Sequence, residues 1–398
     1  MKNITLFTMT AMGLSTFGGG LLSSGIAIAD DGFYFSGYAR YGLHYSDSVN
    51  EYVAPLGETI GHNVGRLGNE ANGGEFQIGQ RLTSDNGTKW DIALMVDHYS
   101  DDLNLKKFYA KVTNVFESQP GMTVWAGRDF HQRPQAGLND YFLMSHDGQG
   151  GGFTDLQLGG VVFDASIVAQ VAGTGVADNG NYAFTSKLHG IGGFSFLVNY
   201  GFASEKGWAV LDDDGDPTGE LNKASSYHIA GVYDFTRERG YDQIFLRFGD
   251  GADNSVFTRD DDLTTILAHW QGQYDFTDQF EFGYIAAYHT LDNDSPTTDV
   301  DASRDNYSVI VRPMYSWTDI HSTWVEAGYS IVDYKDDGEN SAWKITLSQN
   351  ISYGNAKGGD RPMLRFYATF GDSSNDVAAD DYVAEDTFAL GAMWEAWW

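Results

Sequence analysis

The chain has 398 residues and a formal net charge of -31, from 24 Lys and Arg against 55 Asp and Glu; it has no Cys, and 15% of its residues are aromatic. This charge argues against nucleic-acid binding, which relies on a basic surface that displaces counterions. The absence of Cys excludes a disulfide framework, a thiolate nucleophile and a zinc site with Cys ligands. The 48 Gly and only 7 Pro, together with many Tyr, Phe and Trp, favour strands and tight turns.

The first 29 residues are typical of a signal peptide. Lys2 precedes a long apolar or small-residue segment that ends in Ala27-Ile28-Ala29, a cleavage site of the A-x-A type. We therefore expect export, with residues 1–29 removed and residues 30–398 forming a single domain. Because Lys2 is lost, the mature chain would carry a net charge of 23 − 55 = -32. Beyond this segment no stretch approaches the ~18 consecutive apolar residues that a spanning helix needs.

From Gly32 onward, apolar residues recur at every second position, which is the period of a strand. Alternation and turn signals predict eighteen strands, with sixteen as the alternative. Eighteen strands over the mature chain allow about 20 residues for each strand and its connection, as expected for membrane-spanning strands of ~9–11 residues. The predicted strands begin near Phe33, Gly74, Thr88, Lys106, Met122, Phe153, Val161, Asn181, Gly192, Tyr227, Tyr241, Asp262, Gln279, Asn306, Ile320, Ser341, Arg361 and Asp386.

The connections between these strands differ in length and charge. Residues 205–226 and 371–385 are long and acid-rich, whereas residues 85–87 and 236–240 are short. Long loops at one rim and short turns at the other are typical of bacterial outer-membrane barrels. A large secreted sandwich or β-helix is the alternative, but its outer face should be polar rather than lined with Phe, Tyr and Trp. The sequence thus predicts an all-β, transmembrane antiparallel β-barrel.

Several strings along the chain occur in the order found in one family. They are Gly37-Tyr38-Ala39-Arg40, Arg66-Leu67-Gly68-Asn69-Glu70, Trp125-Ala126-Gly127-Arg128, Arg312-Pro313-Met314-Tyr315, Lys344-Ile345-Thr346-Leu347, Arg361-Pro362 and the terminal Trp397-Trp398. In these the chain resembles the maltoporin family of sugar-specific outer-membrane porins. The resemblance implies an 18-stranded barrel, a homotrimer, an inward-folded third loop that narrows the pore, and facilitated diffusion of sugars.

The resemblance also implies which residues contact the sugar. Sugar rings present C–H faces that stack on aromatic side chains, and hydroxyl edges that exchange hydrogen bonds with charged groups. The positions that match the aromatic slide, or the narrowest part of the pore, are Tyr38, Trp397, Phe245 and Phe142. Those that match the polar track and constriction are Arg40, Arg66, Glu75, Lys106, Arg133 and Asp140. Strand alternation independently turns Tyr38, Arg40, Glu75, Phe245 and Trp397 inward. The alternative for each is a wall ion-pair ladder or an aromatic girdle.

The chain departs from the family pattern at several positions. Gly73-Gly74 and Gly359 stand where the family has slide aromatics, and Gln135 stands where an acidic track residue is expected. The segment 97–106 lacks the Trp with which family members reach a neighbouring pore. These differences favour a short oligosaccharide, or a different glucoside, over a long α-glucan.

The acidic loops suggest cation binding at the mouth of the barrel. Asp212, Asp214 and Asp216 form an oxygen-rich run that resembles a calcium loop, although its spacing departs from the twelve-residue pattern and a solvated loop is the alternative. The loops as a whole are expected to attract cations and to bridge lipopolysaccharide through divalent ions. No other cofactor is predicted.

Three functions follow from these patterns. The first is facilitated diffusion of maltose, a maltodextrin or another small oligosaccharide, and the second is a general, cation-preferring porin with little sugar selectivity. The third is a barrel enzyme such as a lipase or protease, but the chain has neither an H-E-x-x-H nor a G-x-S-x-G motif. The sequence therefore predicts a channel without enzymatic activity.

Overall fold

The computed structural model describes residues 31–48, 52–59, 62–99, 102–171, 180–211, 217–295, 302–335, 338–357, 359–377 and 386–398. The described chain is built from strands and their connections. None of its helices is long and apolar enough to cross a membrane. The predicted signal peptide and the predicted calcium ligands Asp212, Asp214 and Asp216 lie outside the described residues.

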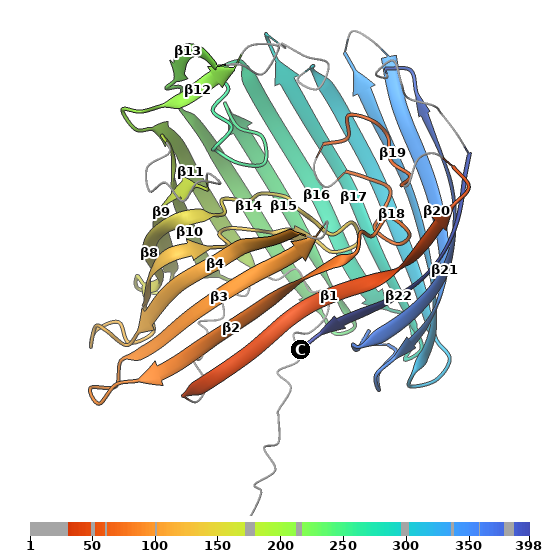
Figure 1. Cartoon of the computed structure of the whole chain (residues 1–398), viewed down its shortest axis with the longest axis horizontal. Coiled ribbons are helices and arrows are strands. Elements are labelled where there is room, and N and C mark those ends of the chain that lie inside the picture. Colours follow the sequence, from red (N-terminus) through yellow and green to blue (C-terminus); the bar gives the residue numbers. More distant parts are fainter. Residues whose placement is uncertain are drawn as a thin grey trace, which may run out of the picture.

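Eighteen strands form one sheet that closes on itself (Figure 1). They are β1 (Gly32–Ser46), β2 (Gly73–Thr83), β3 (Lys89–Tyr99), β4 (Asp102–Thr113), β5 (Thr123–Asp129), β8 (Gly148–Gln157), β9 (Val162–Gln170), β10 (Asn181–Ile191), β11 (Phe194–Ala203), β14 (Ser226–Arg237), β15 (Gly240–Asp250), β16 (Leu263–Asp275), β17 (Phe280–Asn293), β18 (Arg304–Ser316), β19 (His321–Tyr334), β20 (Gly338–Ser352), β21 (Met363–Asn375) and β22 (Asp386–Trp397). Two short hairpins add β6 (Gln135–Ala136) with β7 (Tyr141–Phe142), and β12 (Trp208–Leu211) with β13 (Pro217–Asn222).

Each strand pairs antiparallel with its neighbour, and β1 closes the barrel against β22 from Tyr38 opposite Trp397 to Ser46 opposite Ala389. This confirms the predicted barrel of eighteen strands and excludes the alternative of sixteen. Two strands begin four or more residues earlier than predicted. β4 begins at Asp102 instead of near Lys106, because a bulge interrupts the alternation there. β8 begins at Gly148 instead of near Phe153, because its glycine run carries no side chains that could show a period.

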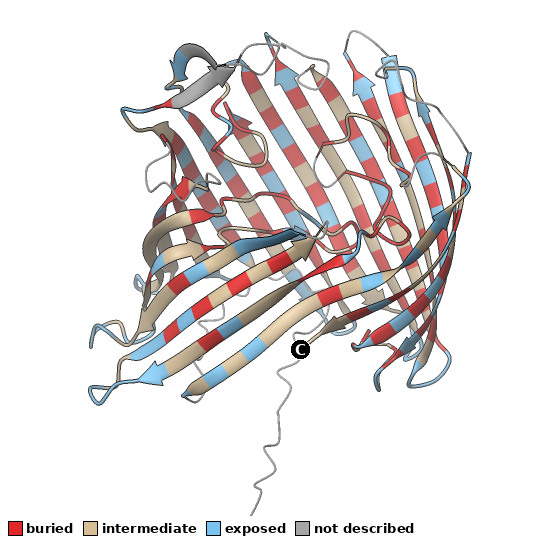
Figure 2. Cartoon of the chain, viewed as in Figure 1, coloured by how far each residue is buried: buried red, intermediate tan, exposed pale blue. Residues whose placement is uncertain are grey.

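The alternation in the sequence separates the two faces of the wall, as the banding in Figure 2 shows. Along β20, Trp343, Ile345 and Leu347 are exposed on the outer face, while the intervening Lys344 and Thr346 are fully buried. An outer belt of large apolar side chains matches a hydrocarbon surrounding, and the polar residues face the lumen. In this middle part of β20 the charged Lys344 therefore faces the interior of the barrel.

Within the described residues, three loops of the long-loop rim fold into the barrel and pack against its inner wall. Loop 3 (residues 130–147) was predicted to do so, and its Leu138, Leu143 and Met144 are buried against wall residues of β11 and β14–β18. The described parts of loop 1 (residues 47–72, described at 47–48, 52–59 and 62–72) and loop 6 (residues 251–262) also enter, which the sequence did not predict. Val53 and Val64 of loop 1 pack on Ala342, and Val256 of loop 6 is buried in a cluster with Trp125. The pore is thus shaped by three inserted loops.

Candidate functional site

The strand register brings the predicted slide and track residues of β1, β2 and β22 onto one patch of the inner wall. Tyr38 lies opposite Trp397 on one side and opposite Glu75 on the other. One step further along β1, Arg40 lies opposite Glu395. Two aromatic rings and their charged neighbours therefore form a continuous surface from β22 to β2. Because inward residues alternate, this grouping follows directly from pairing in the correct register.

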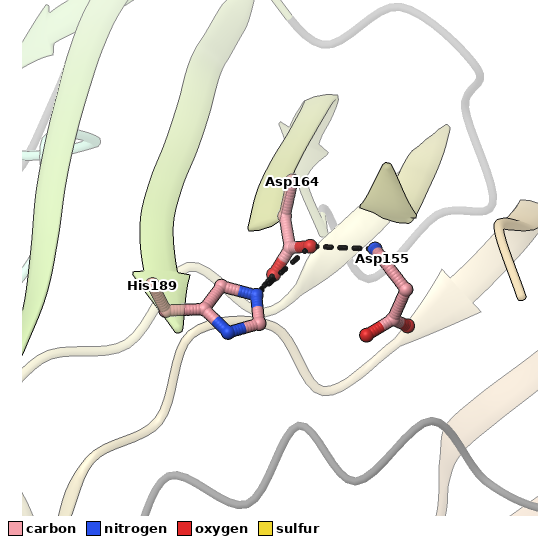
Figure 3. Close-up of side chains that lie close together, drawn as sticks. All are labelled: Asp155, Asp164 and His189. Atoms are coloured by element: carbon pink, nitrogen blue, oxygen red, sulfur yellow. Dashed lines mark hydrogen bonds and ion pairs between the residues drawn. The ribbon is translucent and has the colours of Figure 1, made fainter. Parts of the chain in front are cut away.

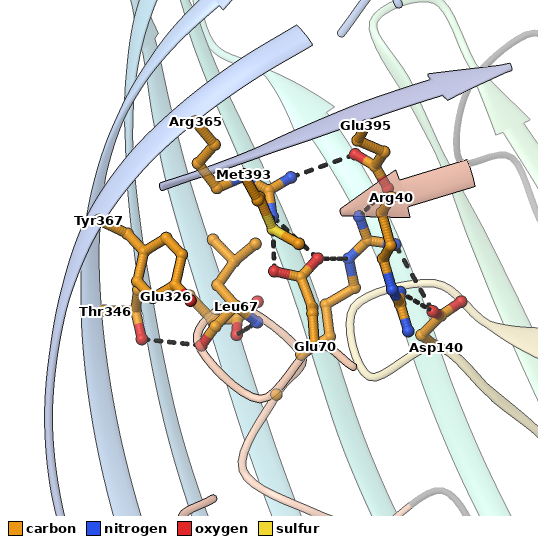
Figure 4. A network of polar contacts seen from close by, with 12 residues as sticks. Arg40, Leu67, Glu70, Asp140, Glu326, Thr346, Arg365, Tyr367, Met393 and Glu395 are labelled. Carbon is orange, nitrogen blue, oxygen red and sulfur yellow. Dashed lines mark hydrogen bonds and ion pairs between the residues drawn. The ribbon is translucent and has the colours of Figure 1, made fainter. Parts of the chain in front are cut away.

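Glu395 is the centre of the charged network drawn in Figure 4. Its carboxylate accepts hydrogen bonds from Arg66 Nη2 at 2.5 Å, Arg361 Nε at 2.7 Å and Arg365 Nη2 at 3.2 Å. The Tyr38 hydroxyl donates to the same carboxylate at 2.9 Å. A predicted slide residue is thus held in place by a carboxylate that the sequence analysis did not single out. The alternation of β22 turns Glu395 inward, and this was the sequence signal that could have identified it.

Glu70, at the end of loop 1, ties that loop to the same cluster. Both of its carboxylate oxygens accept from Arg365 Nη1, at 2.8 and 2.6 Å, and Arg66 Nε lies 3.2 Å from Oε1. Burial by itself raises the pKa of the Glu70 carboxyl, but Arg365 and Arg66 reverse this and hold it below its usual value. Glu70 therefore remains charged and keeps loop 1 against the wall at neutral pH.

A second carboxylate, Glu326 on β19, holds the middle of loop 1. Its Oε1 accepts from the backbone N–H of Leu67 at 2.8 Å, and its Oε2 accepts from Arg312 Nε at 2.9 Å. Lys344 Nζ lies 3.7 Å from the same carboxylate and donates to the Leu67 carbonyl at 2.7 Å. Thr346 donates to that carbonyl at 2.8 Å. The Arg-Leu-Gly-Asn-Glu string in loop 1 is therefore a docking segment.

Loop 3 meets this patch through Asp140. Arg40 Nη1 donates to Asp140 Oδ2 at 2.7 Å, and Gln135 Nε2 donates to Oδ1 at 2.9 Å. Gln135 thus contacts Asp140, a predicted polar-track residue, although Gln135 itself stands where an acidic track residue was expected. Nearby, Arg133 pairs with Asp147 at 2.5 Å. Its guanidinium lies 4.2 Å from the ring centre of Phe142, so an arginine covers one face of that predicted aromatic.

The bulge in β4 explains how Lys106 reaches the lumen. Lys106 is the extra residue between the pairs Leu105–Val96 and Lys107–Met95. A bulge rotates the strand locally, so two consecutive lysines can both face inward. Lys106 Nζ lies 2.9 Å from Asp97, and Lys107 Nζ lies 3.6 Å from Asp129. The Glu75 carboxylate lies near these lysines. Among the described residues its side chain makes no hydrogen bond or ion pair.

Phe245 occupies a different environment from the other predicted slide residues. Its side chain is 0% exposed and packs in the cluster that contains Leu138, Leu143 and Met144 of loop 3. Its inward direction agrees with the alternation of β15, but loop 3 covers the ring. In this arrangement Phe245 supports loop 3 and does not line the open passage.

Aromatic rings lie near both glycine positions where slide aromatics are missing. A Cβ atom at Gly73 would fall 2.1 Å from Cδ1 of Tyr99, so the Tyr99 ring occupies that space. At Gly359 the atom nearest to a Cβ would be Arg361 Nη1, at 3.3 Å, and the Trp324 ring lies 4.0 Å away. Both aromatics belong to inward positions of their strands, and Trp324 is surrounded by guanidinium groups, among them Arg365 at 5.6 Å from its ring centre. The sequence did not predict either ring, because Tyr99 is brought to Gly73 by the pairing of β2 with β3 and Trp324 lies near Gly359 through the path of the connection between β20 and β21.

The constriction cluster combines the groups described above, and it is richer in basic than in acidic residues. Its members are Arg40, Arg66, Arg312, Lys344, Arg361 and Arg365 with Glu70, Asp140, Glu326 and Glu395. Six basic and four acidic side chains leave a local excess of 6 − 4 = 2 positive charges in an otherwise acidic protein. The field at the constriction therefore differs in sign from the net charge of the chain.

Glu58 of loop 1 provides a pH-dependent charge near this cluster. Burial raises the pKa of its carboxyl to about 8, an effect that Lys344 partly offsets. Raising the pH through 8 therefore adds one negative charge inside the barrel. Because the pKa of the Glu58 carboxyl is higher in the folded state than its unfolded value of about 4.5, protonation of this carboxyl stabilises the folded state. This stabilisation is fully present below the unfolded pKa and is lost as the pH rises through 8.

We expect the ratio of cation to anion permeability to increase between pH 7 and pH 9 in the wild type, and to increase less in Glu58→Gln. Reversal potentials in a salt gradient, measured at both pH values, check this. Identical pH curves for the two proteins would show that Glu58 does not titrate in the open channel.

One group outside the constriction has a donor set suited to a metal ion. Asp155, Asp164 and His189 offer ligand atoms that all lie within 4.8 Å of one another (Figure 3). They come from β8, β9 and β10, and His189 Nε2 lies 3.3 Å from Asp164. An Asp–Asp–His set is a common combination for divalent cations. Here the Asp155 N–H already donates to Asp164 at 2.8 Å, so part of the donor capacity is used internally.

Comparisons with known proteins agree with this architecture. The barrel is similar to OpdL of Pseudomonas aeruginosa, with a TM-score of 0.53 and 12% identity over 93% of this chain and 99% of that chain. It is also similar to OccK10 (OpdN) of Pseudomonas aeruginosa, with a TM-score of 0.52 and 11% identity over 92% and 99%. For an anion-selective porin from Comamonas acidovorans the TM-score is 0.50, with 13% identity over 93% and 100%. At these identities the likeness concerns the fold alone.

The sequence match is more specific than the structural likeness. The family model described as LamB porin matches residues 33–398, which includes every strand of the barrel except the first residue of β1. This family match supports the interpretation of the chain as a diffusion channel of the outer membrane rather than an enzyme. The chain belongs to the LamB porin family.

Proposed function

We propose that this porin facilitates the passive diffusion of a small neutral oligosaccharide, such as maltose or a short maltodextrin. The observation that carries the proposal is the pairing of Tyr38 with Trp397 across the β1–β22 junction, directly beside the Glu395 cluster. An aromatic surface lets the apolar face of a sugar ring slide, while the adjacent charged groups exchange hydrogen bonds with its hydroxyls. Tyr99 extends this surface, and Phe245 is left out because loop 3 covers it.

The arginines that line the constriction have two roles in this proposal. The guanidinium of Arg361 lies 4.4 Å from the ring centre of Trp397, so it orients that ring. Arg40 is partly accessible, and it would exchange one of its hydrogen bonds with a passing hydroxyl. Binding at such a site is weak enough for release, because each sugar contact replaces an existing protein contact.

Trp397→Ala is expected to weaken sugar binding by about 1 to 2 kcal/mol, or roughly tenfold, because one aromatic contact is lost. Salt conductance should remain close to the wild-type value, since the carboxylates and guanidiniums of the constriction stay in place. The sugar concentration that halves the ion current measures this effect. Unchanged sugar affinity in the variant would remove Trp397 from the slide.

A general, cation-preferring porin is the second candidate. The net charge of -31 favours it, because an acidic mouth concentrates cations. The basic excess of the constriction cluster opposes it, because this group of side chains disfavours cations. Only a sugar-specific channel has its ion current blocked saturably by sugar, so a blockade titration separates the two candidates.

The assembly and cellular context belong to the same proposal. We infer cleavage after Ala29, a homotrimer in the outer membrane, and contact of the acidic loops with lipopolysaccharide through divalent ions. Electrophoresis in detergent, with and without prior heating, tests the oligomer: a band at the trimer mass that shifts to the monomer mass on heating is the expected result. Addition of a chelator tests the divalent bridge.

A further inference from the structure

Three potential metal ligands meet on the inner wall near the short-turn rim. Asp155 lies near the end of β8, Asp164 near the start of β9 and His189 near the end of β10. The short turn at residues 158–161 joins β8 to β9, so these strand ends lie opposite to the rim that carries loops 1, 3 and 6. Asp164 continues the inward series of the buried Ser166 along β9. The group is therefore part of the pore lining but separate from the constriction cluster.

Two bulges bring these side chains together. The pairing of β8 with β9 shifts within residues 153–156, which places Asp155 in a bulge. The pairing of β10 with β11 shifts within residues 188–191, at His189. A bulge re-aims the side chains that it contains. The backbone of Asp155 has a φ of 63°, which is uncommon for a residue other than glycine. Both neighbours of β9 are thus irregular where they flank Asp164, and their donor groups converge on it (Figure 3).

The hydrogen bonds within this group orient the two carboxylates. Asp164 Oδ1 accepts from the Asp155 N–H at 2.8 Å, and Asp155 Oδ2 accepts from the Thr154 hydroxyl at 2.8 Å. Among the described residues none donates to Asp155 Oδ1. His189 Nε2 lies 3.3 Å from Asp164 Oδ2 and 3.4 Å from Oδ1. Each carboxylate therefore keeps one oxygen that an ion could share with the His189 ring.

The spacing of these atoms suits a small divalent ion. Zn–N and Zn–O bonds are about 2.0–2.2 Å long, so two ligand atoms around a tetrahedral zinc ion lie about 3.4 Å apart. His189 Nε2 and Asp164 Oδ2 already have this separation, at 3.3 Å. One ligand atom of Asp155 lies within 4.8 Å of both, so a modest side-chain rotation completes a set of three.

The electrostatic balance of this part of the wall favours a divalent cation. Among the described residues, His189 is the one basic side chain in ion-pair contact with Asp164, and none is in such contact with Asp155. Lys187 lies opposite Asp164 in the strand register and attracts it from beyond ion-pair distance. The same lysine attracts Asp155 and Asp234. Three carboxylates and one ammonium group, with a neutral imidazole, leave a charge of 1 − 3 = -2, which one divalent ion would balance.

The donor types distinguish between classes of divalent cation. Calcium and magnesium prefer six or more oxygen ligands, whereas an imidazole nitrogen with carboxylate oxygens suits zinc and other first-row transition metals. Three protein ligands also leave a position that water from the lumen can fill.

We propose that Asp155, Asp164 and His189 bind a divalent transition-metal ion, such as zinc, at the short-turn mouth of the pore. The ion would join the ends of β8, β9 and β10. It would also add two positive charges inside the mouth, so its binding lowers the preference of the channel for cations. The site uses no residue of the constriction cluster and does not depend on the proposed sugar transport.

Calorimetric titration of the full porin in detergent micelles with zinc chloride tests the site. Asp164→Asn keeps the shape of the side chain but removes its charge. Loss of an outer-shell partner of a metal ligand costs 10–100-fold in affinity, so loss of a ligand should weaken zinc binding by at least about tenfold. Calcium should bind the wild type at least about tenfold more weakly than zinc.

Two further variants complete the titration. His189→Gln removes the imidazole and covers the case in which Asp164→Asn fails to fold, and it should lose affinity to a similar extent. His321→Ala is the matched control, because this histidine also lies at the short-turn rim, where it bonds to Thr318, and its loss should leave zinc affinity unchanged. Wild-type zinc affinity in both Asp164→Asn and His189→Gln would overturn the site.

Reversal potentials in a salt gradient test the effect on permeation, with zinc added on the short-turn side of a planar bilayer. The cation preference of the wild type should decrease, and that of His189→Gln should not change at the same zinc concentration. An unchanged reversal potential in zinc-saturated wild-type protein would overturn the effect on ion selectivity. Neither result depends on whether sugars block the channel, so failure of this inference is distinguishable from failure of the proposed function.

Discussion

Glu395→Ala is expected to lower the free energy of unfolding by about 3 to 5 kcal/mol, the usual cost of removing one partner from a buried ion pair. The loss is large because Arg66, Arg361 and Arg365 all bond to this carboxylate and are almost completely buried. Without it, three guanidiniums remain in a poorly solvated position without that partner. Chemical unfolding in detergent micelles measures the change.

Two further variants sharpen this experiment. Glu395→Gln keeps the shape and part of the hydrogen bonding but removes the charge, so its loss should be intermediate. Glu339→Ala removes an exposed glutamate on β20 and should be nearly neutral. The Glu395 variants should also loosen loop 1 around Arg66, which loses one of its ion pairs, and so change the single-channel conductance. A Glu395→Ala protein as stable as the Glu339→Ala control would contradict the view that the cluster fixes the loop.

Phe245→Ala is expected to destabilise the barrel by about 3 to 5 kcal/mol, the range for deleting a fully buried phenylalanine ring. The cavity would lie directly beneath Leu138, Leu143 and Met144, so loop 3 would lose part of its support. We therefore expect increased open-channel noise together with the loss of stability. Phe245→Leu fills most of the same space, and its effects on both quantities should be smaller.

This experiment also separates the two interpretations of Phe245. As a slide residue it would affect sugar affinity in both variants without a large change in stability or noise. If Phe245 supports loop 3, removing its ring changes the stability of the barrel and the open-channel noise before it changes sugar affinity. A stable and quiet Phe245→Ala channel with weakened sugar binding would contradict the role assigned to it here.

The sequence predicted the barrel wall because a two-residue period needs no knowledge of distant contacts. Alternation alone placed Tyr38, Arg40 and Trp397 on the inner face, and pairing across β1 and β22 then brought them together. The two displaced strand starts occur where this signal fails, at the bulge beside Lys106 and in the glycine run after Gly148.

The loops could not be predicted in the same way. Loop 1 is irregular and is held by contacts such as that of Arg66 with Glu395, which are 329 residues apart in the sequence. Periodicity gave the inward direction of Phe245 but not the loop that covers it. Likewise, the glycines that replace family aromatics could be seen in the sequence. The nearness of the Tyr99 ring to Gly73 depends on the register of β2 with β3, and that of Trp324 to Gly359 on the path of the connection between β20 and β21.

The central claim is that the constriction recognises sugars. Single-channel conductance in a planar bilayer, with maltose, maltohexaose, sucrose and a β-glucoside titrated separately against the ion current, tests it most directly. The account predicts saturable block by a short neutral oligosaccharide, weakened about tenfold by Trp397→Ala. A robust current that none of the four sugars reduces would contradict it and assign the pore to general diffusion.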